Sequence, residues 1–211
     1  MKKNIFYKIA AFISLALLPA CASLPEKPPQ DFYKSNKIEA PHGNAFTFCS
    51  QYGCKRLTPL SISNDEWADI SNVYGPLAQN AQQEREKISR TIARFEQIIG
   101  ARTGTDIDIA GTFRKIGKGQ LDCVDESTNT TSYLMLLEQN GFLRFHRVGA
   151  PDTRFPIVHS GRWPHQTAVI IEKENGKRYV VDSWFYDNGH PAVVLPIKTW
   201  KEGWKPDGNF R

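Results

Sequence analysis

The sequence predicts an α+β fold, with helices in its N-terminal half and an antiparallel sheet in its C-terminal half. Apolar residues recur every three or four positions over residues 77–99 and again over residues 123–141, which indicates two amphipathic helices. Beyond them, short apolar runs alternate with turn signals, and Asn175-Gly176 between two such runs is typical of an antiparallel hairpin. Helices followed by such strands define the α+β class.

The first twenty residues predict a bacterial lipoprotein signal peptide. Lysines begin the chain, and residues 9–18 form an apolar stretch that is too short to span a bilayer as a stable helix. Residues 18–21, Leu-Pro-Ala-Cys, resemble the lipoprotein cleavage box, which implies that Cys21 carries lipid and anchors the protein to a membrane. Ala22 implies, by resemblance to enterobacterial lipoproteins, the outer membrane, facing the periplasm. The alternative is an ordinary secretory signal with an incidental cysteine.

Behind the leader, the proline-rich residues 21–42 predict a tether, although their second half also fits a strap lying over the fold. Residues 43–211 predict a single domain whose catalytic core covers about 118–197. The formal net charge is +5, but residues 1–20 contain three lysines and no acid, so the remaining chain is left at +2. Without a dense basic cluster, no nucleic-acid partner is expected.

The remaining cysteines divide by role. Cys49 and Cys54 bracket a short loop, and in an oxidising envelope we expect them to form a disulfide. A metal site there is the weaker alternative, because His42 alone does not complete the ligand set. No metal or cofactor is therefore expected. Cys123 is left without a partner, which favours a thiol that is used as a nucleophile over an inert buried one.

The first helices predict a scaffold. Ser63 and Glu66 have the spacing of a capping box, which opens a short helix ending near residue 73. In the longer helix over residues 77–99, one face is apolar and Glu84 is expected on the solvated side. These residues indicate no chemistry of their own.

The candidate active site begins at Cys123, which the pattern places at a helix N-terminus. Unpaired amides and the helix dipole there favour a thiolate. His165 precedes an apolar strand, and Asp182 ends the next strand of the hairpin. A cysteine followed by a histidine and an aspartate on later strands is typical of a thiol acyl-transfer site. His146 and His159 are competing histidines, but neither stands at a clear strand start.

Three short motifs resemble the transglutaminase-like superfamily of papain-type folds, closest to the bacterial transglutaminase-like cysteine proteinases. They are Asp-Cys at residues 122–123, Trp-Pro-His at residues 163–165 and Val-Asp-Ser-Trp at residues 181–184, and the resemblance covers about residues 118–190. It implies a papain-like core with Cys123 as nucleophile, His165 as general base and then acid, and Asp182 as the group that orients the imidazole. The Cys123 amide would help to form the oxyanion hole, and we expect the Gln120 side-chain amide to add a donor.

Hairpin geometry leaves the third member open. A two-residue turn at Asn175-Gly176 places His165 opposite Tyr186, so Asp187 is the alternative to Asp182. A strand near residues 192–195 completes the sheet, and the tail with Trp200 and Trp204 is expected to cover it.

Together these observations predict an envelope-anchored thiol hydrolase. It would cleave a peptide or isopeptide bond of an envelope protein or peptide through an acyl-enzyme. In one alternative, an amine attacks the same acyl-enzyme in place of water, as in a transglutaminase. The other is a catalytically silent lipoprotein that binds an envelope partner, because Leu121 stands where the family has a glycine before the Asp-Cys pair.

Overall fold

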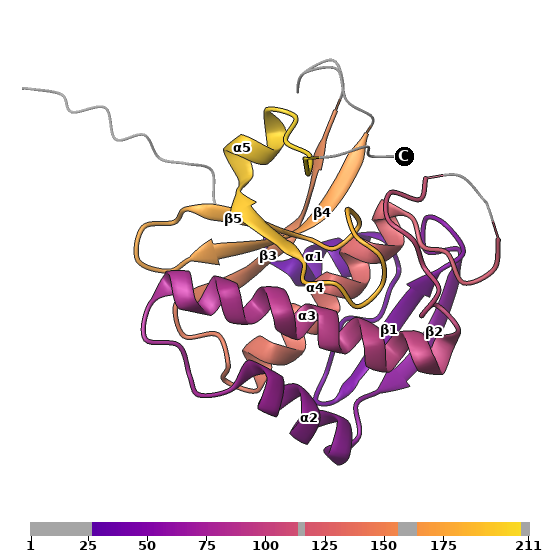
Figure 1. Cartoon of the computed structure of the whole chain (residues 1–211), viewed down its shortest axis with the longest axis horizontal. Helices are drawn as coiled ribbons and strands as arrows, with labels where there is room; N and C mark the ends of the chain where they lie inside the picture. Colours follow the sequence, from indigo (N-terminus) through magenta and orange to yellow (C-terminus); the bar gives the residue numbers. More distant parts are fainter. Residues whose placement is uncertain (1–26, 114–116, 156–163, 208–211) are drawn as a thin grey trace, which may run out of the picture.

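A computed structural model describes residues 27–113, 117–155 and 164–207 and confirms the α+β class (Figure 1). The signal peptide, Cys21, His159 and Trp163 lie outside the described residues. The elements in chain order are α1 (Pro29–Ser35), β1 (Ala45–Ser50), β2 (Arg56–Ser61), α2 (Asn64–Tyr74), α3 (Ala81–Thr103), α4 (Cys123–Gln139), β3 (His146–Arg154), β4 (His165–Glu172), β5 (Arg178–Asp182), β6 (Val193–Pro196) and α5 (Ile197–Lys201).

Helix α4 runs through the centre of the molecule. It packs against α3, against β1 of the two-stranded sheet and against β3 and β4 of the four-stranded sheet. Figure 1 shows α3 crossing in front of it, α2 at the lower edge and α5 at the top. Leu134, Leu136 and Leu137 are fully buried, and its polar side chains are paired: Asn129 exchanges two hydrogen bonds with the Cys49 backbone of β1, at 2.7 and 3.0 Å. This packing makes α4 a rigid support for Cys123, its first residue.

Both ends of α4 follow from the sequence. Asp122 is the N-cap, and its carboxylate accepts the amides of Val124 and Asp125 while Asp125 completes a capping box. After the C-cap, Gly141 takes a φ of +75°, which glycine adopts without steric cost. The predicted start at Cys123 is confirmed.

The four-stranded sheet is antiparallel throughout, in the order β3-β4-β5-β6. The predicted two-residue turn at Asn175-Gly176 is wrong. Ala168 lies opposite Val181, and the turn comprises residues 173–176, with the Glu172 amide bonded to the Lys177 carbonyl at 2.8 Å. The longer turn moves the register by two residues, which keeps every side chain on its predicted face.

The segment before β1 is a strap in its second half, which is the alternative that the sequence left open for residues 21–42. Helix α1 places Tyr33 in the core at 1% exposure, and its hydroxyl bonds the Thr128 carbonyl and Ser132 of α4, at 3.0 and 2.7 Å. Strands β1 and β2 form the expected hairpin, and the predicted Cys49–Cys54 disulfide is confirmed.

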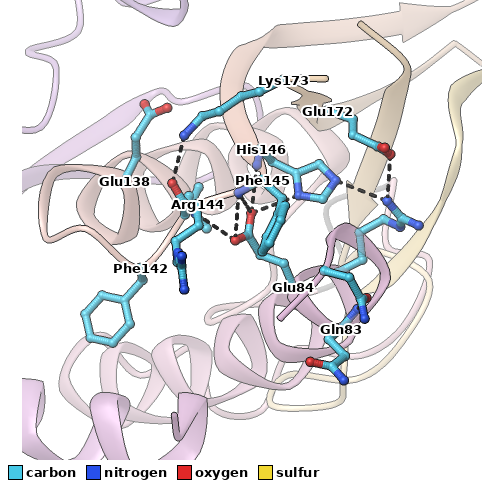
Figure 2. A network of polar contacts seen from close by, with 12 residues as sticks. Gln83, Glu84, Glu138, Phe142, Arg144, Phe145, His146, Glu172 and Lys173 are labelled. Carbon is cyan, nitrogen blue, oxygen red and sulfur yellow. Dashed lines mark hydrogen bonds and ion pairs between the residues drawn. The ribbon is translucent and has the colours of Figure 1, made fainter. Parts of the chain in front are cut away.

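Helix α2 begins at the predicted capping box of Ser63 and Glu66. The prediction that Glu84 of α3 is solvated is wrong, because its side chain is fully buried (Figure 2). Its carboxylate accepts the backbone amides of residues 144–146 at 2.7–3.1 Å and bonds His146 Nδ1 at 2.9 Å. These donors replace the water that the carboxylate loses, so Glu84 holds α3 to the start of β3.

Within the described residues, no helix has both the length and the apolar character that crossing a membrane requires.

Candidate active site

The structure brings the three predicted site residues together at the ends of three elements. Cys123 is the first residue of α4, His165 is the first of β4 and Asp182 is the last of β5. Since β4 pairs with β5, and Gln166 of β4 bonds Ser127 near the start of α4, the three residues lie toward the same end of the sheet.

His165 is bonded to Asp182 through Nε2 and Oδ2 at 2.8 Å. Continuing the register from Ala168 and Val181 places Thr167 opposite Asp182, so His165 lies on the same face, one diagonal step away. Long side chains bridge that diagonal. The structure thus pairs His165 with Asp182, while Asp187, the alternative, accepts the Ala110 amide at 2.8 Å.

The Asp182 contact fixes the tautomer of His165. A carboxylate only accepts, so Nε2 carries the hydrogen and Nδ1 keeps a lone pair. Nδ1 is buried and has no hydrogen-bond partner in the described part of the chain. A buried acceptor without a partner costs about 1–3 kcal/mol, and such atoms concentrate where a reaction uses them.

The Cys123 thiol lies near the start of β4. The backbone amide of Gln166, the residue after His165, favours the charged form of the sulfur. The Gln166 side chain donates to Ser127 at 2.8 Å, one turn along α4 from Cys123. Cys123 is partly exposed and is the free cysteine among the residues described, so an incoming substrate has access to it.

The predicted resting thiolate is corrected. Burial, with smaller contributions from the carboxylates of Asp122 and Asp182, raises the pKa of the Cys123 thiol to about 12 against the opposing effect of the Gln166 amide. Desolvation outweighs the helix dipole, whose effect is typically below about 1 kcal/mol. The sulfur is therefore a neutral thiol at rest and requires a base to become a nucleophile.

Aromatic rings enclose the imidazole of His165. The centroids of Trp184, Phe185 and Trp200 lie 4.5, 5.2 and 5.5 Å from its own, and the histidine is 2% exposed. Such a wall excludes water and strengthens the hydrogen bond to Asp182, and ring faces stabilise a protonated imidazole.

Asp182 has a second donor that the sequence did not reveal. The indole Nε1 of Trp200 donates to the same Oδ2 atom at 2.8 Å. Sequence analysis placed Trp200 only as part of a covering tail, because no local pattern connects α5 with the end of β5.

Gln120 anchors the loop that precedes the nucleophile. Its Nε2 donates to the Ile107 carbonyl at 2.7 Å, and its Oε1 accepts from the Ile109 amide and Thr112 at 3.3 and 3.2 Å. One Nε2 hydrogen is committed to this loop, so an oxyanion role for Gln120 stays a prediction that rests on the other.

Three carboxyl groups lie behind the site. Burial raises the pKa values of Glu96 to about 7 and of Asp108 to about 6, and it raises that of Glu126 well above its usual range. Glu126 and Asp108 share a side-chain hydrogen bond, which between two carboxyl groups requires a proton. Glu126 also bonds Ser183, the residue after Asp182, so the cluster connects α4 to the end of β5.

Among the described residues, no group of three His, Cys, Asp or Glu side chains is arranged to hold a metal ion. Comparison of the chain with models of known protein families, with curated proteins and with solved structures finds no match in any of the three.

Proposed function

We propose that this chain is an envelope-anchored thiol hydrolase that cleaves a peptide or isopeptide bond through an acyl-enzyme. One observation carries the proposal: a buried histidine at the start of β4 holds Asp182 with one ring nitrogen, while its other ring nitrogen is unpartnered within the described structure, and a free thiol begins α4, the helix that packs against β4. Nucleophile, base and orienting group in this order are the requirements of covalent acyl transfer.

In the first half of the reaction, Nδ1 of His165 takes the thiol proton as the Cys123 sulfur attacks the carbonyl carbon. The thiol pKa of about 12 makes this transfer part of the attack, since little thiolate exists beforehand. The carbonyl becomes an oxyanion next to the helix start, where the Cys123 amide is oriented to donate. His165 then gives its proton to the leaving amine, and a thioester remains.

In the second half, water attacks the thioester. Nδ1 of His165 accepts a proton from that water, the carboxylic acid product leaves, and the proton returns to the sulfur. Asp182 holds the ring in the Nε2–H tautomer and offsets the charge of the imidazolium in both halves. General-base transfer of this kind contributes roughly 10²–10⁴-fold in rate.

The resemblance to transglutaminase-like cysteine proteinases supports the same assignment, because it implies these three residues in these roles. It also covers transfer of the acyl group to an amine, which shares the thioester. The lipoprotein-like residues 18–21 support anchoring at Cys21 and a substrate among envelope proteins or peptides.

A trapped acyl-enzyme tests the proposal. The full-length protein is mixed with p-nitrophenyl acetate, release of nitrophenol is followed, and the acetylated peptide is mapped by mass spectrometry. We expect a burst with acetate on Cys123, followed by slow hydrolysis, and no burst in Cys123→Ala or His165→Ala. Addition of a primary amine that shortens the thioester lifetime and appears in the product would assign transamidation instead.

A catalytically silent lipoprotein that binds an envelope partner is the second candidate. The observation that favours it is the raised pKa of Cys123, which is what a merely buried thiol shows. It predicts no burst, and acetylation of Cys123 that is the same with and without His165.

A further inference from the structure

We infer that Trp200 is a positioning residue of this site, which holds Asp182 through its indole N–H and thereby weakens the attraction of that carboxylate for a protonated His165. The inference rests on the proposed function, because it assigns Trp200 a task in preparing the base. The two donors on Asp182, Trp200 Nε1 and His165 Nε2, lie at 2.8 Å each and share the oxygen Oδ2.

Trp200 is held in place by burial and by contacts with Arg154. Its side chain is fully buried, and its ring faces the guanidinium of Arg154 with 4.7 Å between Cζ and the ring centroid. Arg154 Nη1 also donates to the carbonyls of Trp200 and Trp204 at 2.7 and 2.9 Å, which ties α5 to the end of β3. Arg154 is the register partner of His165, so the strand next to the histidine positions the helix that holds its aspartate.

The shared oxygen gives this contact a chemical effect. A hydrogen bond from Trp200 spreads the negative charge of Asp182, so the carboxylate attracts the imidazolium less strongly. The imidazolium form of His165 is then stabilised less than it would be beside a carboxylate with one donor. The consequence is a larger fraction of neutral imidazole, which is the form that accepts a proton from Cys123.

The other charged groups near His165 are the same with or without this contact. Asp182 bonds His165 from β5, and Asp122 and Cys123 lie at the start of α4, where Asp122 and Asp182 both act on the Cys123 thiol. Arg154 approaches from β3, against Phe185 and Trp200. A change confined to the indole N–H therefore reports on the Trp200–Asp182 bond alone.

The test compares Trp200→Phe with Trp204→Phe in the full-length protein. Both variants lose an indole N–H from the same tail, but the N–H that bonds Asp182 belongs to Trp200. A third variant carries 3-benzothienylalanine at position 200, which keeps the bicyclic shape, lacks the N–H and controls for packing. The pKa of His165 is measured by NMR titration, and the rate of Cys123 alkylation by iodoacetamide is followed across pH.

We expect the His165 pKa to rise by about one unit in both position-200 variants, which is a tenfold change in proton affinity. Alkylation at pH 6 then falls about tenfold and recovers at pH 8.5, whereas Trp204→Phe matches the wild type. A His165 pKa that is unchanged in the benzothienyl variant would overturn the inference while His165-dependent alkylation of the wild type still stood. Alkylation indifferent to His165 would instead overturn the proposed function.

Discussion

Two buried histidines of this molecule invite comparison. His146 begins β3 and His165 begins β4, and each bonds a buried carboxylate, Glu84 at 2.9 Å and Asp182 at 2.8 Å. The second ring nitrogen differs. In His146, Nε2 meets Arg85 at 3.2 Å, whereas Nδ1 of His165 has no partner among the described residues.

On our proposal, this difference separates a structural histidine, His146, from a reactive one, His165. Around His146 every polar atom contributes to joining α3, β3 and β4, since Arg85 continues to Glu172 at 3.0 Å (Figure 2). Around His165 the hydrogen bonding stops at Nδ1, which has no partner among the described residues. Burial, a carboxylate partner and a strand start are common to both histidines, so those features alone do not identify a catalytic base.

The largest expected effect comes from removing the carboxylate of the reactive histidine. Asp182→Asn removes the charge that holds the Nε2–H tautomer, and we expect the rate of Cys123 acylation to fall by about 10²–10⁴-fold. Burst kinetics with p-nitrophenyl acetate measure it. Asp187→Asn is the matched control, and we expect it to remain within about twofold; a larger loss there than at Asp182 would reverse the assignment of the third residue.

Removing the carboxylate charge at the other histidine should affect stability instead. Glu84→Gln leaves three amides and His146 facing an uncharged group, and we expect unfolding to become about 2–4 kcal/mol easier. Urea denaturation measures the loss, with the exposed Glu86→Gln as control. In the folded variant, Cys123 should be acylated at the wild-type rate. A slower acylation would mean that the Glu84–His146 pair also contributes to the proposed site.

Acid should weaken the Glu84 contacts. Four hydrogen bonds to His146 and residues 144–146 hold the pKa of Glu84 below its usual range, despite the opposing effect of burial, which is the largest single contribution. A lowered folded pKa gives stability that is present above the unfolded value and lost as pH falls through the folded one. Stability should therefore drop below about pH 4.5 in the wild type and less steeply in Glu84→Gln.

The carboxyl cluster of Glu96, Asp108 and Glu126 should have the opposite pH dependence, with stability falling as pH rises. Burial raises the folded pKa of Glu96 to about 7 and that of Asp108 to about 6, so the folded state binds more protons than the unfolded chain. Stability is then present below the unfolded values and lost as pH rises from about 4 to 7, by roughly 3 kcal/mol for Glu96 alone.

Glu126→Gln sharpens that prediction. The amide donates a hydrogen bond to Asp108 as the protonated Glu126 does, without a proton to lose. Thermal unfolding across pH 4 to 8 should show a flatter decline in this variant than in the wild type. An identical slope would mean that Glu126 does not share in the titration.

Much of the site was predictable from the sequence because its signals are local. The Asp122 cap and the apolar spacing behind it placed Cys123 at a helix start, and His165 and Asp182 flank apolar strands. The pairing of the last two was open, since Asn175-Gly176 indicates a turn but not that the turn spans residues 173–176. The turn is two residues longer than predicted, and the resulting register places His165 next to Asp182 and not Asp187.

Other features depend on tertiary contacts and had no local signal. Glu84 stands in a charged run of α3 and becomes buried only because residues 144–146 present their amides to it. The lowered pKa expected for Cys123 failed for a related reason, since partial burial of the thiol disfavours its charged form more than the helix start favours it. Periodicity predicts which face of a helix is buried, but it does not predict what that face meets.

Alkylation of Cys123 by iodoacetamide between pH 4 and 9, in the wild type and in His165→Ala, tests the central claim most directly. Peptide mapping separates Cys123 from Cys49 and Cys54. If Nδ1 of His165 is the base, the wild-type rate rises with the deprotonation of the imidazole, persists well below pH 8 and falls at least about 100-fold in His165→Ala. Labelling that appears only above pH 8, at the same rate in both proteins, would contradict the account and leave His165 as structural as His146.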